Sequence, residues 1–307
     1  MIVLPVLAAA GGAASLLVGA AGLGWPDADI LWQIRLPRAV LALLCGAALG
    51  GSGAALQGLL RNRLADPGLL GFSGCASLGA VLAFYFGLYA TTALALPLAA
   101  LAGALAGAVL LLAFARRAEG TTLILAGVAL ASLASAALTL ALALAPSPFA
   151  LAEITVWLLG SLEDRAPEHV LLAGPPIIVG LVVLARTRGR LDALALGEPT
   201  AASLGVDPRR LARRVALGVA LCVGGATAVA GSVGFVGLIV PNLLRAVLGE
   251  RPSLLVLPAA FAGAVLLVLA DIAVRLIPTA QELRLGVLTA LLGAPVLAWA
   301  ALRAGRA

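Results

Sequence analysis

Long apolar segments follow one another along almost the whole chain, and they restrict its fold more than any other feature of the sequence. A helix needs about 20 apolar residues to cross the hydrocarbon core of a bilayer. Only 11% of the 307 residues are charged, whereas soluble domains carry about 25%. The sequence therefore predicts an all-α, polytopic membrane protein with about ten transmembrane helices, organised as one domain over residues 1–307. The expected segments are 2–23, 39–59, 68–87, 93–115, 122–145, 169–185, 211–230, 235–248, 254–277 and 285–302.

Two stretches are assigned from their flanks. The first 24 residues lack a positively charged start, and their apolar run exceeds the roughly 7–15 residues of a signal-peptide core. They are therefore expected to form the first membrane helix. Residues 149–162 contain Glu153 and Trp157 and lie between two prolines, so they are expected to form a short interfacial helix on the outer, periplasmic side.

The distribution of basic residues predicts the orientation of the chain. All 20 basic residues are Arg, and the formal net charge is +6. If the N-terminus is inside, fifteen arginines are cytoplasmic and only Arg35, Arg38, Arg165, Arg275 and Arg284 are on the outer side. Because cytoplasmic loops carry the excess of basic residues, both termini are expected in the cytoplasm. The arginines do not gather in one patch, so no nucleic-acid partner is expected.

Small residues are spaced for close packing of helices. Gly46 and Gly50, and likewise Gly103 and Gly107, have the GxxxG spacing that lets helix backbones approach each other in lipid. The high Ala and Gly content also admits a simpler explanation, namely genomic composition. Ten crossings divide into two halves of five, and an odd number makes a related second half inverted. We therefore expect two inverted five-helix halves, although no clear sequence repeat is visible.

The sequence offers few groups for energy coupling or catalysis. Most predicted crossings contain no Asp, Glu, His, Lys or Arg, which proton-coupled carriers usually place in the membrane; sodium coupling through backbone carbonyls stays open. A P-loop needs a Lys, and the chain has none, so it is not expected to hydrolyse ATP. His169, Cys45, Cys75 and Cys222 lack metal-binding spacing. No metal, cofactor or catalytic residue is predicted.

Asp271 and Arg275 are the exception among the apolar segments. Their i, i+4 spacing places them on one face of a helix, where they can pair. Two interpretations stay open: a gate or docking element, or mutual neutralisation that lets the end of the helix enter the membrane.

The longest inner segment, residues 186–214, has the pattern of a structured connection. Residues 194–205 are expected to form a short helix, with Pro199 at its first helical position and Gly205 at its stop. Asp207 is expected to cap the next helix. The apolar side chains of this segment indicate either a contact with a partner or a connector that packs on itself.

Several stretches together resemble the membrane permease of type II ABC importers, the family that takes up cobalamin, haem and ferric siderophores. They keep the order of the family over nearly the whole chain. The stretches are Arg35-Leu-Pro-Arg38, residues 53–71, residues 125–129, Trp157 with Gly160 and Ser161, residues 196–206, residues 234–241, Ala270-Asp271 with Arg275, and Glu282 followed by residues 286–295.

This resemblance implies a homodimer in the inner membrane of a bacterium, with two ATPase subunits on the cytoplasmic side and a soluble binding protein on the outer side. ATP and Mg²⁺ would then belong to the ATPase partner. Arg35, Arg38 and Arg275 would meet acidic residues of the binding protein. The ATPase-coupling residues would be Leu196, Gly197, Glu198, Ala201, Leu204, Gly205 and Val206. The residues of the translocation pathway and its gate would be Gly120, Thr121, Thr122, Ser132, Ser135 and Thr139.

Two residues depart from the pattern of the family. Arg63 stands where the inner loop usually has proline, and Asn242 stands where the eighth crossing usually has histidine after Pro241. Neither change removes an evident catalytic group, but both put the local detail at these positions in doubt.

The expected function is import of an iron chelate, either haem or a ferric siderophore, by alternating access powered by a separate ATPase subunit. Cobalamin is the second choice, and both choices rest on the breadth of the family. An ion-coupled secondary transporter is the alternative from another class, and it would accumulate substrate without any partner.

Overall fold

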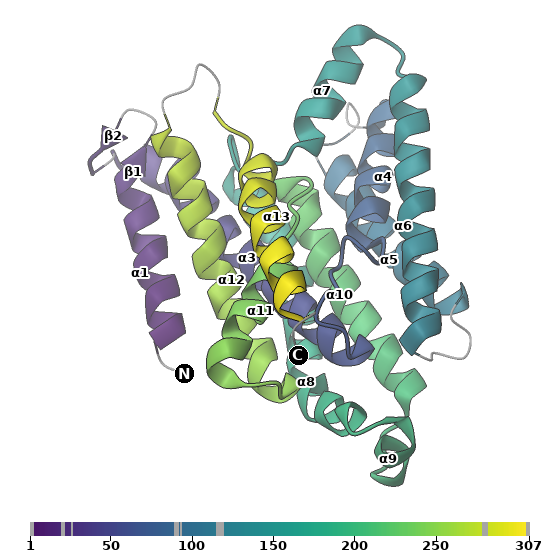
Figure 1. Ribbon diagram of the computed structural model, residues 1–307. Helices are drawn as coiled ribbons and strands as arrows, with labels where there is room; N and C mark the ends of the chain where they lie inside the picture. The colour runs from purple at the N-terminus through teal and green to yellow at the C-terminus, as the bar shows by residue number, and fades with distance from the viewer. Residues whose placement is uncertain are drawn as a thin grey trace.

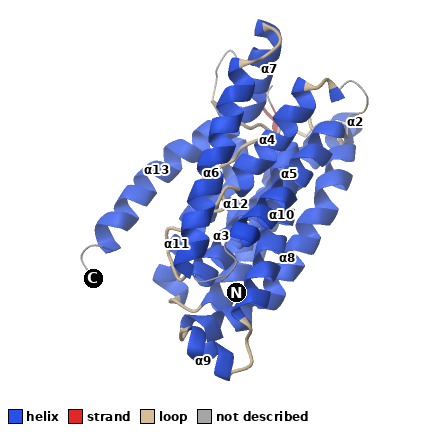
Figure 2. Ribbon diagram, turned by 90° about the vertical axis from the view of Figure 1, so that its right-hand side faces the viewer, coloured by secondary structure: helices blue, strands red, loops and turns tan. Residues whose placement is uncertain are grey.

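A computed structural model describes residues 3–19, 22–25, 27–88, 92, 94–114, 120–277 and 282–304, and helices form most of it (Figures 1 and 2). Two short strands, β1 (Val18–Gly19) and β2 (Gly22–Leu23), pair antiparallel after the first helix. The helices are α1 (Val3–Leu17), α2 (Ala28–Ile30), the π-helical η1 (Leu31–Arg35), α3 (Leu36–Leu60), α4 (Phe72–Tyr85), α5 (Ala95–Phe114), α6 (Gly120–Ala143), α7 (Pro148–Leu158), α8 (Pro167–Ala195), α9 (Glu198–Ser203), α10 (Pro208–Ala230), α11 (Val236–Leu248), α12 (Pro252–Leu276) and α13 (Leu285–Ala304).

Each of the ten predicted apolar segments contains a helix, which confirms the all-α membrane fold. Six helical stretches are long and apolar enough to cross a bilayer by length and composition, and the count of ten crossings is approximate because α1, α4, α11 and α13 are shorter in the part that the structure describes. These six stretches are Ala28–Leu60, Ala95–Phe114, Thr122–Ala143, Pro167–Ala195, Pro208–Ala230 and Pro252–Leu276.

Two boundaries differ from the sequence-based expectation. The first helix ends at Leu17 because the chain turns into the β1–β2 hairpin. The helix that contains the sixth apolar segment does not end with it at residue 185. This helix, α8, continues to Ala195 and carries several arginines in its last turns. Charged side chains interrupt hydropathy but not helical geometry, so the inner connection is shorter than residues 186–214 suggest. It consists of α9 and the few residues around it.

The helix order divides into two halves of the same design. The first half is α1, α3, α4, α5 and α6, and the second is α8, α10, α11, α12 and α13. The second helix of each half packs against the fourth helix of the other: α3 against α12, and α10 against α5. The third helix of each half is short, and each follows a residue with positive φ, Gly71 (83°) and Phe235 (67°). This exchange of packing partners agrees with two inverted halves.

Small residues are what allow these helices to pack so closely. A Cβ atom on Gly46 would overlap the carbonyl group of Gly263 on α12, and one on Gly103 would overlap the carbonyl oxygen of Cys75 on α4. The interpretation of the GxxxG spacings as packing sites is therefore confirmed. The three cysteines are buried and free, as expected of small packing residues.

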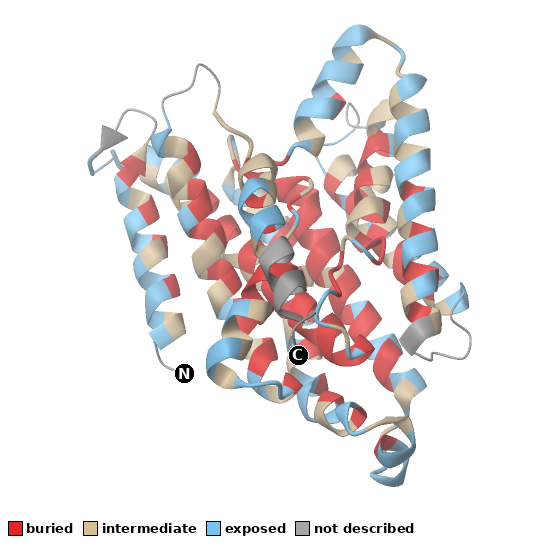
Figure 3. Cartoon of the chain, viewed as in Figure 1, coloured by how far each residue is buried: buried red, intermediate tan, exposed pale blue. Residues whose placement is uncertain are grey.

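The core runs through the middle of the bundle, and the flanking helices are less buried (Figure 3). Buried residues concentrate in α3, α10 and α12, whereas α6 buries only 28% of its most apolar stretch inside the chain. α7 and the β-hairpin lie at one end of the bundle, and α9 lies at the other (Figure 1). α1 begins and α13 ends in the half that contains α9.

Candidate functional site

Four charged side chains form a buried cluster at the end of the bundle that holds the β-hairpin. Arg38, in the first turn of the 25-residue α3, pairs with Asp271 of α12 at 2.9 Å and with Glu282. Arg275, one turn after Asp271, pairs with the same carboxylate at 2.8 Å. The side chains of Asp271 and Arg275 are only 1% and 4% exposed. Two cations and two anions therefore neutralise one another where solvation is lost.

The cluster also holds the first helix and the hairpin. Arg275 donates to the carbonyl oxygens of Ser15 and Val18 at 3.1 and 2.7 Å, and to the hydroxyl of Ser15. Arg35 donates to the carbonyl oxygens of Leu16 and Gly24 at 2.7 and 2.9 Å. These contacts satisfy carbonyl groups at the end of α1, which a helix leaves without partners.

All three arginines expected to dock a binding protein are thus engaged within the chain. Arg38 and Arg275 share Asp271, and Arg35 anchors the hairpin. The i, i+4 pairing of Asp271 and Arg275 is observed, and the neutralisation interpretation describes its geometry. The docking role stays a prediction, and it would require an incoming carboxylate to compete with Asp271 or Glu282.

At the opposite end, the connection between α8 and α10 contains the predicted short helix and cap, but α9 covers only Glu198–Ser203, and residues 194 and 195 belong to the end of α8. Asp207 caps α10 by accepting hydrogen bonds from the backbone of Arg209 and Arg210 at 2.9 and 3.2 Å, and these bonds hold the pKa of Asp207 below its ordinary value. α9 starts after Gly197, whose φ is 105°. Pro199 lies in its first turn, where a missing N–H costs nothing.

The coupling residues do not share one environment. Ala201 is buried, and Val206 packs against the core, so these two hold α9 to its own chain. Leu196 and Leu204 are exposed, at 66% and 61%. Glu198 reaches the guanidinium of Arg61 at 3.9 Å. Ala201 and Val206 therefore fit the interpretation of a connector that packs on itself, whereas contact of the exposed Leu196 and Leu204 with a partner stays a prediction.

The two departures from the family pattern meet in space. The side-chain amide of Asn242, on α11, donates to the backbone carbonyl of Arg63 at 3.0 Å. Arg63 pairs with Glu250 at 2.8 Å, and Arg245 donates to the Asn242 oxygen at 2.8 Å. The α3–α4 loop is thereby fastened to α11 on the side of the bundle that contains α9.

The residues expected to form the pathway lie along α6. Gly120, Thr121 and Thr122 form its first turn. Ser132, Ser135 and Thr139 are exposed on the chain, and the Thr139 hydroxyl donates to the Ser135 carbonyl at 3.0 Å. These hydroxyl residues face away from the bundle and not into it. Their role in a pathway stays a prediction that depends on what covers α6.

Asp66 is a buried carboxyl group in the loop between α3 and α4. One oxygen accepts a hydrogen bond from the backbone of Gly68 at 2.8 Å, and the other lies close to Gly237 in the first turn of α11. Burial raises the pKa of Asp66 from 3.8 to about 6. A negative charge near the start of α11 is compatible with the helix dipole.

The raised pKa of Asp66 makes a prediction about pH. The unfolded chain releases this proton near pH 3.8 and the folded chain near pH 6, so the folded state binds more protons between these values. Stability is therefore expected to fall as pH rises through this window, by up to about 3 kcal/mol. Asp66→Asn, which can keep the bond from Gly68, should remove this pH dependence. Thermal unfolding in nanodiscs at pH 4.5 and 7.5 measures it, and equal pH dependence in both proteins would contradict it.

A helical bundle with inverted halves, neutralised charge clusters and an exposed helical connection is the architecture of a polytopic membrane protein. A model of the FecCD transport family matches residues 6–303. The chain is 41% identical to the vitamin B12 import system permease protein BtuC of Vibrio cholerae over 281 residues, covering 90% of this chain and 84% of the relative. BtuC of Salmonella typhi is 40% identical over 280 residues, with the same coverage.

A solved structure has the same architecture. It belongs to an ABC transporter of the proposed metal-chelate type in an inward-facing conformation, and it matches with a TM-score of 0.89 and 30% identity over 98% of both chains. The chain belongs to the FecCD transport family, and it is the membrane-spanning permease of an ABC importer of type II. The resemblance noted in the sequence is confirmed. Membership implies ATPase partners and a substrate-binding protein.

Several contacts at the site were not predicted from the sequence. The pairs Arg38–Asp271, Gln57–Gly237 and Arg63–Glu250 join residues far apart in the chain. The signal for the first was present, because Arg38 and Asp271 are isolated charges at the outer ends of apolar segments. No local pattern indicates the other two.

Proposed function

We propose that this chain is the permease of a cobalamin importer. The observation that carries the proposal is the identity of 40–41% with permeases named for vitamin B12 import, over about nine tenths of this chain. The earlier expectation favoured haem or a ferric siderophore, and nothing in these relatives supports iron specifically. Cobalamin, the second choice from the sequence, is the better supported substrate.

The importer would work as a homodimer with two ATP-hydrolysing subunits and a soluble binding protein, in the inner membrane of a bacterium with both chain ends in the cytoplasm. Exposed apolar side chains on α6 and α13, such as Leu133 and Leu291, are available for contact with a second copy or with lipid. The exposed Leu196 and Leu204 are available to the ATPase. ATP and Mg²⁺ would bind in that partner, since this chain has no Lys for a P-loop.

A metal chelate other than cobalamin is the second candidate. It is favoured by one observation, the structural match to a transporter of the proposed metal-chelate type. Cobalamin and the other metal chelates are both candidate substrates, and the uptake experiment described next distinguishes them.

Uptake by the reconstituted complex tests the proposal. The permease, its ATPase and its binding protein in liposomes should accumulate radiolabelled cobalamin only when ATP is inside, because most crossings offer no ion-coupling group. The permease alone should accumulate none, even with a proton or sodium gradient. Preference for haem or a ferric siderophore over cobalamin would overturn the substrate, and gradient-driven uptake by the permease alone would overturn the mechanism.

A further inference from the structure

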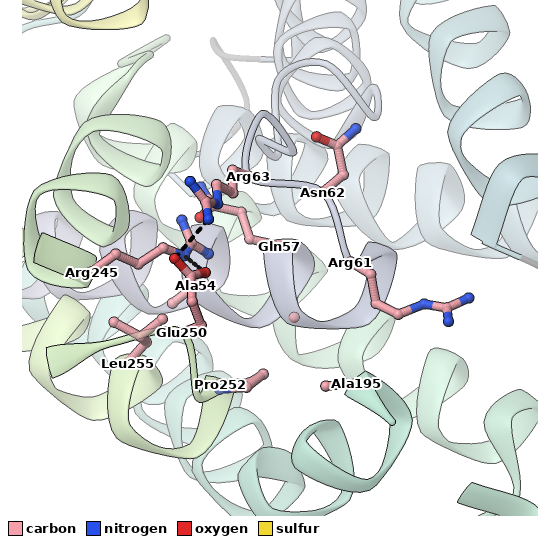
Figure 4. A pocket seen from close by; sticks show the side chains of 11 residues that line it. Ala54, Gln57, Arg61, Asn62, Arg63, Ala195, Arg245, Glu250, Pro252 and Leu255 are labelled. Carbon is pink, nitrogen blue, oxygen red and sulfur yellow. Dashed lines mark ion pairs between the residues drawn. The ribbon is translucent and has the colours of Figure 1, made fainter. Parts of the chain in front are cut away.

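A cavity of about 240 Å³ opens beside Ala195, the last residue of α8 before α9. Figure 4 shows the side chains that line it. The end of α3 and the loop after it form one wall, and the α11–α12 connection forms the other. The volume is well above the roughly 10–15 Å³ that one water needs. The mouth is polar and faces solvent, because the side chains of Arg63 and Glu250 are 59% and 61% exposed. Leu255 and Gln57 are buried in its lining.

The lining has an excess of positive charge. Arg61, Arg63 and Arg245 line the cavity, and Glu250 is its single acidic residue. Arg63 and Arg245 share this carboxylate, at 2.8 and 3.4 Å. The nearest ion-pair partner of Arg61, Glu198 at 3.9 Å, is not part of the lining. Three guanidinium groups around one carboxylate leave a net charge of about +2 for an anion to neutralise.

Gln57 adds a second and independent feature. Its side chain is 2% exposed, and its amide nitrogen donates to the Gly237 carbonyl at 3.1 Å, which fixes the orientation of the amide. Its Oε1 atom is buried and has no hydrogen-bond partner among the residues that the structure describes. A buried acceptor without a partner costs free energy. The cavity therefore calls for a hydrogen-bond donor beside Gln57 and for acceptor oxygens beside the arginines.

We propose that this cavity binds a phosphate group that carries a hydroxyl. The phosphate oxygens would accept hydrogen bonds from Arg63 and Arg245, since guanidinium groups bind phosphate in a bidentate manner. The hydroxyl would donate to Gln57. Two sources share this chemistry: free hydrogen phosphate, and the glycerol phosphate headgroup of an anionic lipid in the adjacent leaflet. The argument uses only the residues of this cavity and no contact with the transported substrate, so the inference does not rest on cobalamin import.

Two probes distinguish the sources in binding experiments on the full chain. Calorimetric titration of the detergent-solubilised protein with inorganic phosphate tests the free ion, with sulfate for comparison because sulfate carries no hydroxyl at neutral pH. Native mass spectrometry from nanodiscs of phosphatidylglycerol and phosphatidylcholine tests the headgroup. We expect saturable binding of phosphate in preference to sulfate, or retention of phosphatidylglycerol in preference to phosphatidylcholine.

Matched arginine variants connect the binding to the cavity. R63Q and R245Q should each weaken the preferred probe about tenfold or more, because each removes charge-assisted hydrogen bonds. R213Q changes an exposed arginine on α10 outside the cavity and should leave binding unchanged. The exposed side chain of Arg63 makes R63Q a change that the fold tolerates, so the test stays decisive if R245Q unfolds. E250Q should tighten binding, because it removes the competing carboxylate.

Each remaining outcome overturns the proposal. If neither probe binds saturably, the cavity is only hydrated. Binding that R213Q weakens as much as R63Q would be general attraction to a basic surface. Weaker binding in E250Q would contradict the electrostatic argument. Cobalamin uptake enters none of these measurements, so failure here leaves the proposed function standing.

Discussion

Asp271→Asn is expected to lower the free energy of unfolding by about 3–5 kcal/mol. Asp271 is the carboxylate that Arg38 and Arg275 share, and its side chain is 1% exposed. Asparagine keeps the size of the side chain but removes the negative charge, so two guanidinium groups would depend on Glu282 alone. Removing one partner of a buried ion pair costs this much because the remaining charge stays buried without compensation. Thermal unfolding of the purified permease in nanodiscs measures the loss.

Glu163→Gln is the matched control. Glu163 pairs with Arg284 at 3.0 Å, but its side chain is 39% exposed. Pairs of this kind contribute about 0–1 kcal/mol, so the change in unfolding midpoint should be small. If Asp271→Asn were as mild as Glu163→Gln, the cluster would be hydrated in the membrane, and its structural role as described would be wrong.

The same cluster constrains how a binding protein could dock. Arg38 and Arg275 already have anionic partners, so an incoming carboxylate would exchange with an internal one and not meet a free cation. Glu282 is the more accessible of the two internal carboxylates, at 17% exposure against 1% for Asp271. Such an exchange favours orientation of the partner more than affinity. Docking would then loosen the contact between α3 and the segment before α13.

The sequence was sufficient to predict the helices, since each apolar segment is a local property. It was also sufficient for the Asp207 cap and the Asp271–Arg275 pair, which involve neighbours within one turn. Where the charged end of α8 follows an apolar stretch, hydropathy placed the boundary at residue 185 and the helix continued to Ala195. Hydropathy indicates which residues lie in the hydrocarbon core of the bilayer, whereas the ends of a helix depend on capping and backbone hydrogen bonds.

The charge clusters could not be predicted in the same way. Arg38 and Asp271 lie 233 residues apart, and only the packing of α3 against α12 brings them together. Arg63 and Asn242 each looked like an isolated departure from a family pattern. In the structure they are in contact: the backbone carbonyl of Arg63 accepts a hydrogen bond from Asn242, and the Arg63 side chain pairs with Glu250.

Gly53→Ala is expected to destabilise the permease by about 3 kcal/mol or more. Gly53 lies on α3 against the first turn of α11, and a Cβ there would overlap the carbonyl group of Gly237. That carbonyl also accepts the hydrogen bond from Gln57. Because the obstacle is backbone, no side-chain rotation relieves it, and α11 must move away from α3. Overpacking of a filled core costs about 1–3 kcal/mol and occasionally more.

Gly189→Ala makes the same substitution in a helix without the obstacle. A Cβ on Gly189, in the extended end of α8, meets nothing within 4 Å. Alanine is the better helix former by about 0.8–1 kcal/mol, so this variant should melt slightly higher than the wild type. The two substitutions are thus expected to change the unfolding midpoint in opposite directions. A Gly53→Ala protein that melts like Gly189→Ala would show that α3 and α11 are not held at this close distance. The described position of α11, the short third helix of the second half, would then be wrong.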